Sequence, residues 1–110
     1  MILIQTQSGI ALDIGMGALE FEVDSVQRAS IWKISELFSI RTCTADDLVV
    51  HKAFASRDRD WLDVEGILMR QGKKLNLPQI FAALRPLVEL KEDPDILPRL
   101  ECMMQKRGLL

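Results

Sequence analysis

Charged side chains stand at regular offsets in the middle of this 110-residue chain, between Thr44 and Leu68, in an otherwise apolar stretch. Six of them have the residue types of a phosphate-binding site: Asp47, Lys52, Arg57, Arg59, Asp60 and Asp63. Lysine and arginine bind phosphate groups, and neighbouring carboxylates hold such cations in place. We therefore expect the three cations to converge on one corner that binds a phosphate-bearing ligand. The alternative is a solvated helix face with local ion pairs, such as Arg59 with Asp63 four residues later.

Two short helices are expected to position these side chains. Thr44 is a good N-cap for the first helix, and Asp47 stands where a weak capping box would place its acid. The polar residues 56–58 interrupt the apolar run, so a second helix is predicted to start near Asp58 or Arg59. One side of this second helix is apolar, with the spacing of a buried stripe. That stripe consists of Trp61, Val64, Ile67 and Leu68.

The charged run also resembles a known motif. Asp47-Leu48 is followed by Lys52 and then by Arg57-x-Arg59-Asp60-x-x-Asp63. This order resembles the C-terminal motif of nucleotidyltransferase-like proteins of the DNA polymerase β superfamily, which include the nucleotidyltransferase toxins of abortive-infection systems. Asp47 replaces the usual Glu of that motif. The resemblance implies Mg²⁺ and a nucleoside triphosphate as cofactors, with Lys52, Arg57 and Arg59 as phosphate contacts and the three acids orienting them.

The same family holds its metal with an Asp-x-Asp that follows a Gly-Ser turn, and with a third acid from a neighbouring strand. Asp13, within Leu12-Asp13-Ile14, resembles that third acid, which makes it the candidate catalytic residue and metal ligand. The alternative is that Asp13 is a strand-end residue on the solvent-exposed face. The Gly-Ser and Asp-x-Asp motif itself does not occur in the sequence. The resemblance therefore implies a truncated nucleotidyltransferase domain, inactive alone and completed by a partner chain.

The composition bounds the class of protein. Apolar residues make up 48% and charged residues 27% of the chain, which is typical of a single globular domain, here residues 1–110. The net charge of −2 gives no support to nucleic-acid binding. No apolar run reaches the roughly 20 residues of a membrane span, and no signal peptide is evident, so a cytoplasmic protein is expected. Cys43 and Cys102 are interpreted as two buried thiols, with a disulfide as the alternative.

The rest of the chain predicts an α+β fold. Residues 2–6 and 10–14 are expected to form a hairpin, and residues 31–34 and 38–42 are expected to be extended. A short helix is predicted over 21–30, with Val23, Val26 and Ala29 facing inward. Residues 1–43 would thus supply a small, mainly antiparallel sheet that packs against four or five helices, most of them within residues 44–110.

Two further helices are predicted after Gly72, which is a natural helix stop. The first is capped by Asn76 and is kinked or shortened by Pro86, with a buried stripe formed by Ile80, Phe81, Leu84, Leu87 and Val88. The last buries Leu97, Leu100, Met103 and Met104 and ends at Gly108. The methionines are interpreted as core residues.

Two functions from different classes fit these observations. The first is a nucleotidyltransferase-like protein that keeps a phosphate-binding corner. The second is a non-catalytic interaction module, such as an antitoxin-like protein or a degenerate partner subunit. Both predict a homo-oligomer or a complementary protein chain, because an incomplete sheet leaves an unpaired edge. The only histidine, His51, is interpreted as a partly exposed helix residue, and neither a zinc site nor a Ser/His nucleophile is assigned.

Overall fold

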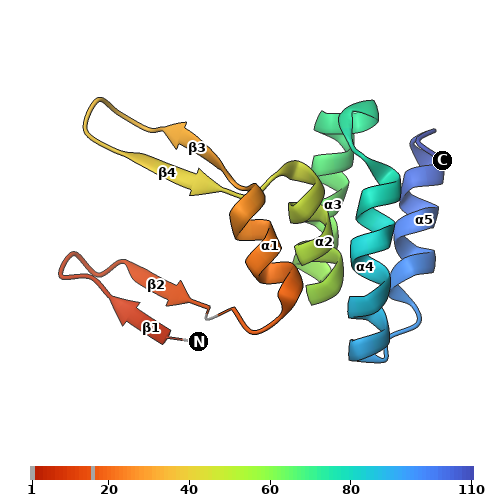
Figure 1. Ribbon diagram of the computed structural model, residues 1–110, viewed down its shortest axis with the longest axis horizontal. Helices are drawn as coiled ribbons and strands as arrows, with labels where there is room; N and C mark the ends of the chain where they lie inside the picture. Colours follow the sequence, from red (N-terminus) through yellow and green to blue (C-terminus); the bar gives the residue numbers. More distant parts are fainter. Residues whose placement is uncertain (1, 16) are drawn as a thin grey trace.

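Five α-helices and two antiparallel hairpins make up the described residues, 2–15 and 17–110, of this computed structural model. The hairpins project from one side of a helical body (Figure 1). The elements follow in the order β1 (Ile2–Gln5), β2 (Ala11–Ile14), α1 (Glu20–Arg28), β3 (Ser30–Lys33), β4 (Ser39–Thr42), α2 (Ala45–Ala55), α3 (Asp58–Gln71), a 3-10 turn (Gly72–Lys74), α4 (Leu77–Lys91) and α5 (Ile96–Lys106). The predicted α+β class is confirmed. Among the described residues, no helix is long and apolar enough to cross a membrane.

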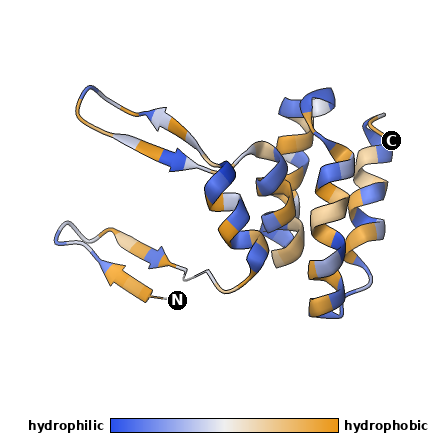
Figure 2. Cartoon of the chain, viewed as in Figure 1, coloured by the Kyte–Doolittle hydropathy of each residue, from blue (hydrophilic) through white to orange (hydrophobic). Residues whose placement is uncertain are grey.

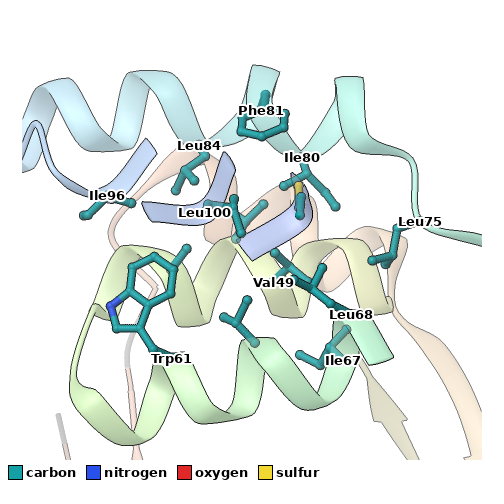
Figure 3. Close-up of a cluster of buried hydrophobic side chains, with 14 of the residues drawn as sticks. Val49, Trp61, Ile67, Leu68, Leu75, Ile80, Phe81, Leu84, Ile96 and Leu100 are labelled. Carbon is teal, nitrogen blue, oxygen red and sulfur yellow. The ribbon is translucent and has the colours of Figure 1, made fainter. Parts of the chain in front are cut away.

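The hydrophobic core lies between α2, α3, α4 and α5 (Figure 3). The predicted apolar stripes of α3 and α4 are buried, because each repeats at three- and four-residue spacing along one face of its helix. Met104 is fully buried and Met103 packs against the core, as expected. Every buried apolar side chain of the described residues comes from the segment 49–104. The helical body therefore has a complete core without the hairpins.

The helix ends follow the predicted capping signals. The Thr44 hydroxyl accepts a hydrogen bond of 3.1 Å from the backbone N–H of Asp47, and the Asn76 side chain accepts one of 3.2 Å from that of Gln79. Gly72 ends α3 at a φ of 50°, which glycine adopts without strain. Helix α4 continues for five residues beyond Pro86.

The strands form two separate two-stranded sheets. Hairpin A (residues 2–14) pairs β1 with β2, so that Ile2 lies opposite Ile14. Hairpin B (residues 30–42) pairs β3 with β4, so that Trp32 lies opposite Ile40. Every strand residue is exposed except Thr42, which is half-buried. The expected single sheet packed against the helices is thus replaced by two hairpins in solvent, and Figure 2 shows apolar residues on both.

Helix α1 docks on α2 through a different face from the predicted one. Val23 and Val26 were expected to face inward, but they are 53% and 63% exposed. The buried residue of α1 is Ser25, and Phe21 is half-buried beside it. The prediction was wrong because α1 is held mainly by polar partners on α2 rather than by an apolar stripe.

Candidate functional site

The corner between α2 and α3 brings four of the predicted charged residues together. Ser56 ends α2 in the left-handed region at a φ of 60°, and the chain reverses so that α3 starts at Asp58. Lys52 Nζ then lies 3.4 Å from an Asp60 oxygen and 2.9 Å from an Asp63 oxygen. Arg57 Nε lies 2.6 Å from the other Asp60 oxygen. Four of the six predicted residues therefore lie together.

Asp60 is the centre of the corner, and its side chain is fully buried. Its carboxylate also accepts a hydrogen bond of 3.2 Å from the backbone N–H of Arg57, which caps the start of α3. The Arg57 guanidinium is the main cause of a pKa of about 2 for Asp60, because together with the backbone N–H and Lys52 it outweighs the effect of burial. Asp63, with a smaller effect from Asp60, raises the pKa of Lys52, and Asp60 raises the pKa of Arg57.

The charges of this corner cancel. Two cations, Lys52 and Arg57, face two carboxylates, Asp60 and Asp63, and each cation already bonds at least one carboxylate. A phosphate would have to compete with these acids for the same N–H donors. The geometry thus fits an internal ion-pair network that fixes the angle between two helices.

Two of the predicted residues do not take part in this ion-pair network. Asp47 forms a two-bond ion pair with Arg28 of α1, with distances of 2.9 and 3.0 Å, so its role in orienting the corner cations is corrected. Arg59 is exposed and belongs to none of the ion pairs found in residues 2–15 and 17–110; its expected pair with Asp63 is replaced by the Lys52–Asp63 contact.

Asp13 lies on β2 of hairpin A, exposed and opposite Leu3. Figure 1 shows that this hairpin projects away from α2 and α3, so Asp13 and the corner do not form one site. No group of three or more Asp, Glu, His or Cys side chains within the described parts of the chain is arranged to hold a metal ion. In addition, both oxygens of Asp60 are occupied by cations. These residues do not fit the Mg²⁺ site that the family resemblance implied.

Sequence reasoning missed a polar contact that joins α1 to α2. Ser25 Oγ lies 3.1 Å from His51 Nε2, and the Phe21 ring packs on the imidazole with its centroid 4.9 Å away. The pair borders a cavity of about 710 Å³ that Arg41 and Cys43 also line. Only the i, i+4 spacing of Phe21 and Ser25 hinted at this face, and nothing in the sequence assigned His51 as their partner.

Acidification is expected to loosen this contact. Burial lowers the pKa of His51, helped by the cation Arg28 and opposed by Asp47 and Glu22. An unfolded histidine titrates near pH 6.5. The stabilising effect of a neutral His51 is therefore complete above about pH 6.5 and decreases as the pH falls below it. Chemical denaturation at pH 7.5 and 5.5 should show a larger loss of stability for the wild type than for His51→Gln, and equal losses would contradict the assignment.

The cysteines are both free, and neither is fully buried as was expected. Cys43 is half-buried, and burial raises the pKa of its thiol. Cys102 is exposed on α5, beside a second cavity of about 840 Å³ between α3 and α5. Three of the charged residues at this second cavity already have partners, since Arg107 pairs with Glu65 at 3.0 Å and Arg99 stacks on Trp61 at 4.6 Å.

No protein-family model matches this chain, and no curated protein or solved structure shows significant similarity to it. The resemblance of residues 47–64 to the nucleotidyltransferase motif therefore stays a hypothesis about these residues. A functional proposal has to start from the geometry of the molecule, in which the exposed hairpins are the largest unexplained feature.

Proposed function

We propose that this chain is a protein-interaction module whose two hairpins bind another polypeptide. The observation that supports this proposal is an apolar face on each hairpin that no other part of the described chain covers. The helical body needs no such partner, because its core is complete and the described part of the chain has no buried side-chain nitrogen or oxygen without a hydrogen bond.

Hairpin A places five large aliphatic side chains on one face. The pairing of Ile2 with Ile14 and of Ile4 with Leu12 sets this face, and the strand alternation adds Ile10. These five side chains are 42–60% exposed. The opposite face carries Asp13 and smaller or polar residues apart from Leu3.

Hairpin B repeats this arrangement. Trp32 lies opposite Ile40, and Ile34 bonds Phe38 through the backbone at the next position on the same face. These four side chains are 46–61% exposed. The other face carries Lys33, Ser39 and Arg41, together with one large apolar residue, Ile31. Each hairpin is therefore amphipathic in the way expected of a strand pair with one covered face.

Physical chemistry favours covering these faces. A two-stranded hairpin alone is at best marginally stable in water, and an open strand edge offers its backbone N–H and C=O groups to another strand. Strand addition at such an edge is a common mode of protein recognition, in which the backbone supplies affinity and the side chains supply specificity.

The test is to place a charge on each apolar face and measure association. Ile4→Lys and Ile40→Lys should each weaken binding of the chain to its partner at least tenfold. Leu90→Lys is the matched control, because Leu90 is a comparably exposed aliphatic residue on α4, outside both hairpins. Equal binding by all three variants in sedimentation velocity and pull-down measurements would reject the proposal.

A second candidate function is suggested by the corner itself: a nucleotidyltransferase-like protein that binds nucleotide and requires a partner chain to supply the metal ligands. The supporting observation is that Lys52, Arg57, Asp60 and Asp63 lie together as the family resemblance implied. ATP or GTP with Mg²⁺ should then raise the melting temperature of the chain in the presence of its partner. Arg59→Ala, which leaves the ion pairs intact, should reduce that shift, and no shift with either nucleotide would exclude this function.

A further inference from the structure

We infer that the polypeptide bound by the hairpins is a second copy of this chain, with hairpin A of each copy pairing with hairpin B of the other. This inference rests on the proposed function and names its partner. The two hairpins belong to separate sheets and project from the same side of the helical body, so each keeps its free strand edges in the single chain (Figure 1).

The exposed apolar surface has the size that a stable dimer needs. Nine large side chains on the two apolar faces are each about half exposed. Aromatic side chains bury roughly 150–250 Å² each and aliphatic ones less, so these faces leave several hundred Å² of apolar surface per chain. A standard protein–protein interface buries about 800 Å² on each partner. A second copy that covers both faces would therefore form an interface of ordinary size.

The side-chain charges of the two hairpins are complementary. Asp13 is the only charged side chain of hairpin A, and hairpin B carries Lys33, Glu36 and Arg41, so the first is acidic and the second has a net positive charge. Two copies of hairpin A side by side would place like charges together, and so would two copies of hairpin B. Pairing A with B brings opposite charges together, which favours the mixed contact.

The register that pairs these charges also matches the apolar faces. Strands β2 and β4 are each four residues long, and Asp13 and Arg41 are the third residue of their strands. An antiparallel alignment with Asp13 opposite Arg41 places Ile14 opposite Ile40 and Leu12 opposite Thr42. The apolar faces of the two hairpins then lie on the same side of one four-stranded sheet, and the two such sheets of the dimer would cover each other's apolar faces.

A reciprocal A–B pairing closes the assembly at two chains. Because each copy contributes one acidic and one basic hairpin, a twofold axis makes the A–B contact twice and leaves no hairpin unpaired. Such an isologous arrangement closes at the dimer, which is the commonest symmetry of homo-oligomers.

The experiment makes self-pairing depend on charge. In Asp13→Lys both hairpins of a chain are basic, and in Arg41→Glu both are acidic. We expect the wild type to be a dimer by light scattering, each variant alone to dimerise at least tenfold more weakly, and an equimolar mixture to form a heterodimer with wild-type affinity. Glu101→Lys and Arg85→Glu are the controls, because both change an exposed charge of the helical body and should leave the dimer unchanged.

Arg41 donates a hydrogen bond of 3.0 Å to the Val26 carbonyl, so its replacement is checked by circular dichroism. Lys33→Glu is a second variant that makes hairpin B acidic without removing that bond. Failure of the equimolar mixtures to restore the dimer, for both acidic variants, would overturn the reciprocal pairing. The wild type could instead be monomeric and bind a different protein, with Ile40→Lys weakening that binding. This result would overturn the second copy as the partner but would leave the proposed function standing. A monomeric wild type with no hairpin-dependent partner would overturn both.

Discussion

Replacing Asp60 with alanine is expected to lower the free energy of unfolding by about 2–4 kcal/mol. The substitution removes the charge-assisted hydrogen bonds to Arg57 and Lys52 and the cap on the Arg57 backbone N–H at the start of α3. Lys52 and Arg57, which lose their partner, are partly exposed and can be solvated by water. The loss of stability is therefore smaller than for a fully buried ion pair. Urea denaturation at pH 7, monitored by circular dichroism, measures the change.

Two matched variants separate the causes of this loss. Asp60→Asn keeps the side-chain volume and an acceptor for the Arg57 backbone N–H, so it should lose about half as much. Asp63→Asn removes an exposed carboxylate that bonds Lys52 alone, and should change stability by roughly 0.5 kcal/mol or less. If Asp60→Ala were no more destabilising than Asp63→Asn, the corner would not be structural and its cations would be available for a ligand.

The pH dependence of Asp60 gives an independent check. Its pKa is lowered from an ordinary 3.8 to about 2, so the folded state keeps the carboxylate charged where the unfolded state takes up a proton. The stabilising effect is therefore complete above about pH 4 and is lost as the pH falls through about 2. The wild type should lose stability over this range more steeply than Asp60→Asn. Parallel pH profiles would show that the ion pairs add no stability.

The helical body was predictable because its signals are local. Apolar residues at three- and four-residue spacing define the buried faces of α3 and α4, and Thr44, Asn76 and Gly72 mark helix ends through contacts within a few residues. The cluster of Lys52, Arg57 and Asp60 was predictable for the same reason, since eight residues separate its members and one reversal of the chain joins them.

The position of α1 was not predictable in this way. Its contacts span 19 residues for Arg28 with Asp47 and 26 residues for Ser25 with His51. A polar helix face has no periodic signal, whereas Val23 and Val26 suggested an apolar stripe that the structure leaves exposed. The sequence also assigned Asp47 to the corner, because spacing along a helix does not reveal that Arg28 of α1 forms an ion pair with this carboxylate.

The hairpins show a different limit. The sequence predicted hairpin A and the extended segments of hairpin B, which are local properties, but it did not predict that the segments of hairpin B pair with each other. Whether two hairpins join one sheet depends on edges that meet only in the folded chain. Asp13 was linked to the corner by resemblance alone, and the exposed position of hairpin A removes that link.

Replacing Leu84 with alanine is expected to lower the free energy of unfolding by about 3 kcal/mol. Leu84 on α4 is fully buried within the core cluster, so the substitution removes apolar contacts and leaves a cavity that closely packed helices fill only in part (Figure 3). Urea denaturation of a dilute sample, in which the chain is monomeric, measures this change. Size measurements at higher concentration should show association close to that of the wild type.

Ile40→Ala is the matched comparison, and it should behave in the opposite way. Ile40 is 46% exposed on hairpin B, so the dilute chain should lose less than about 1 kcal/mol, because little buried contact is removed. The same substitution should weaken association, since Ile40 lies on the apolar face of hairpin B. A core residue would then determine folding and a hairpin residue would determine assembly. If Ile40→Ala destabilised the dilute monomer as much as Leu84→Ala, the hairpins would belong to the folded core, and their exposed faces would no longer argue for a partner.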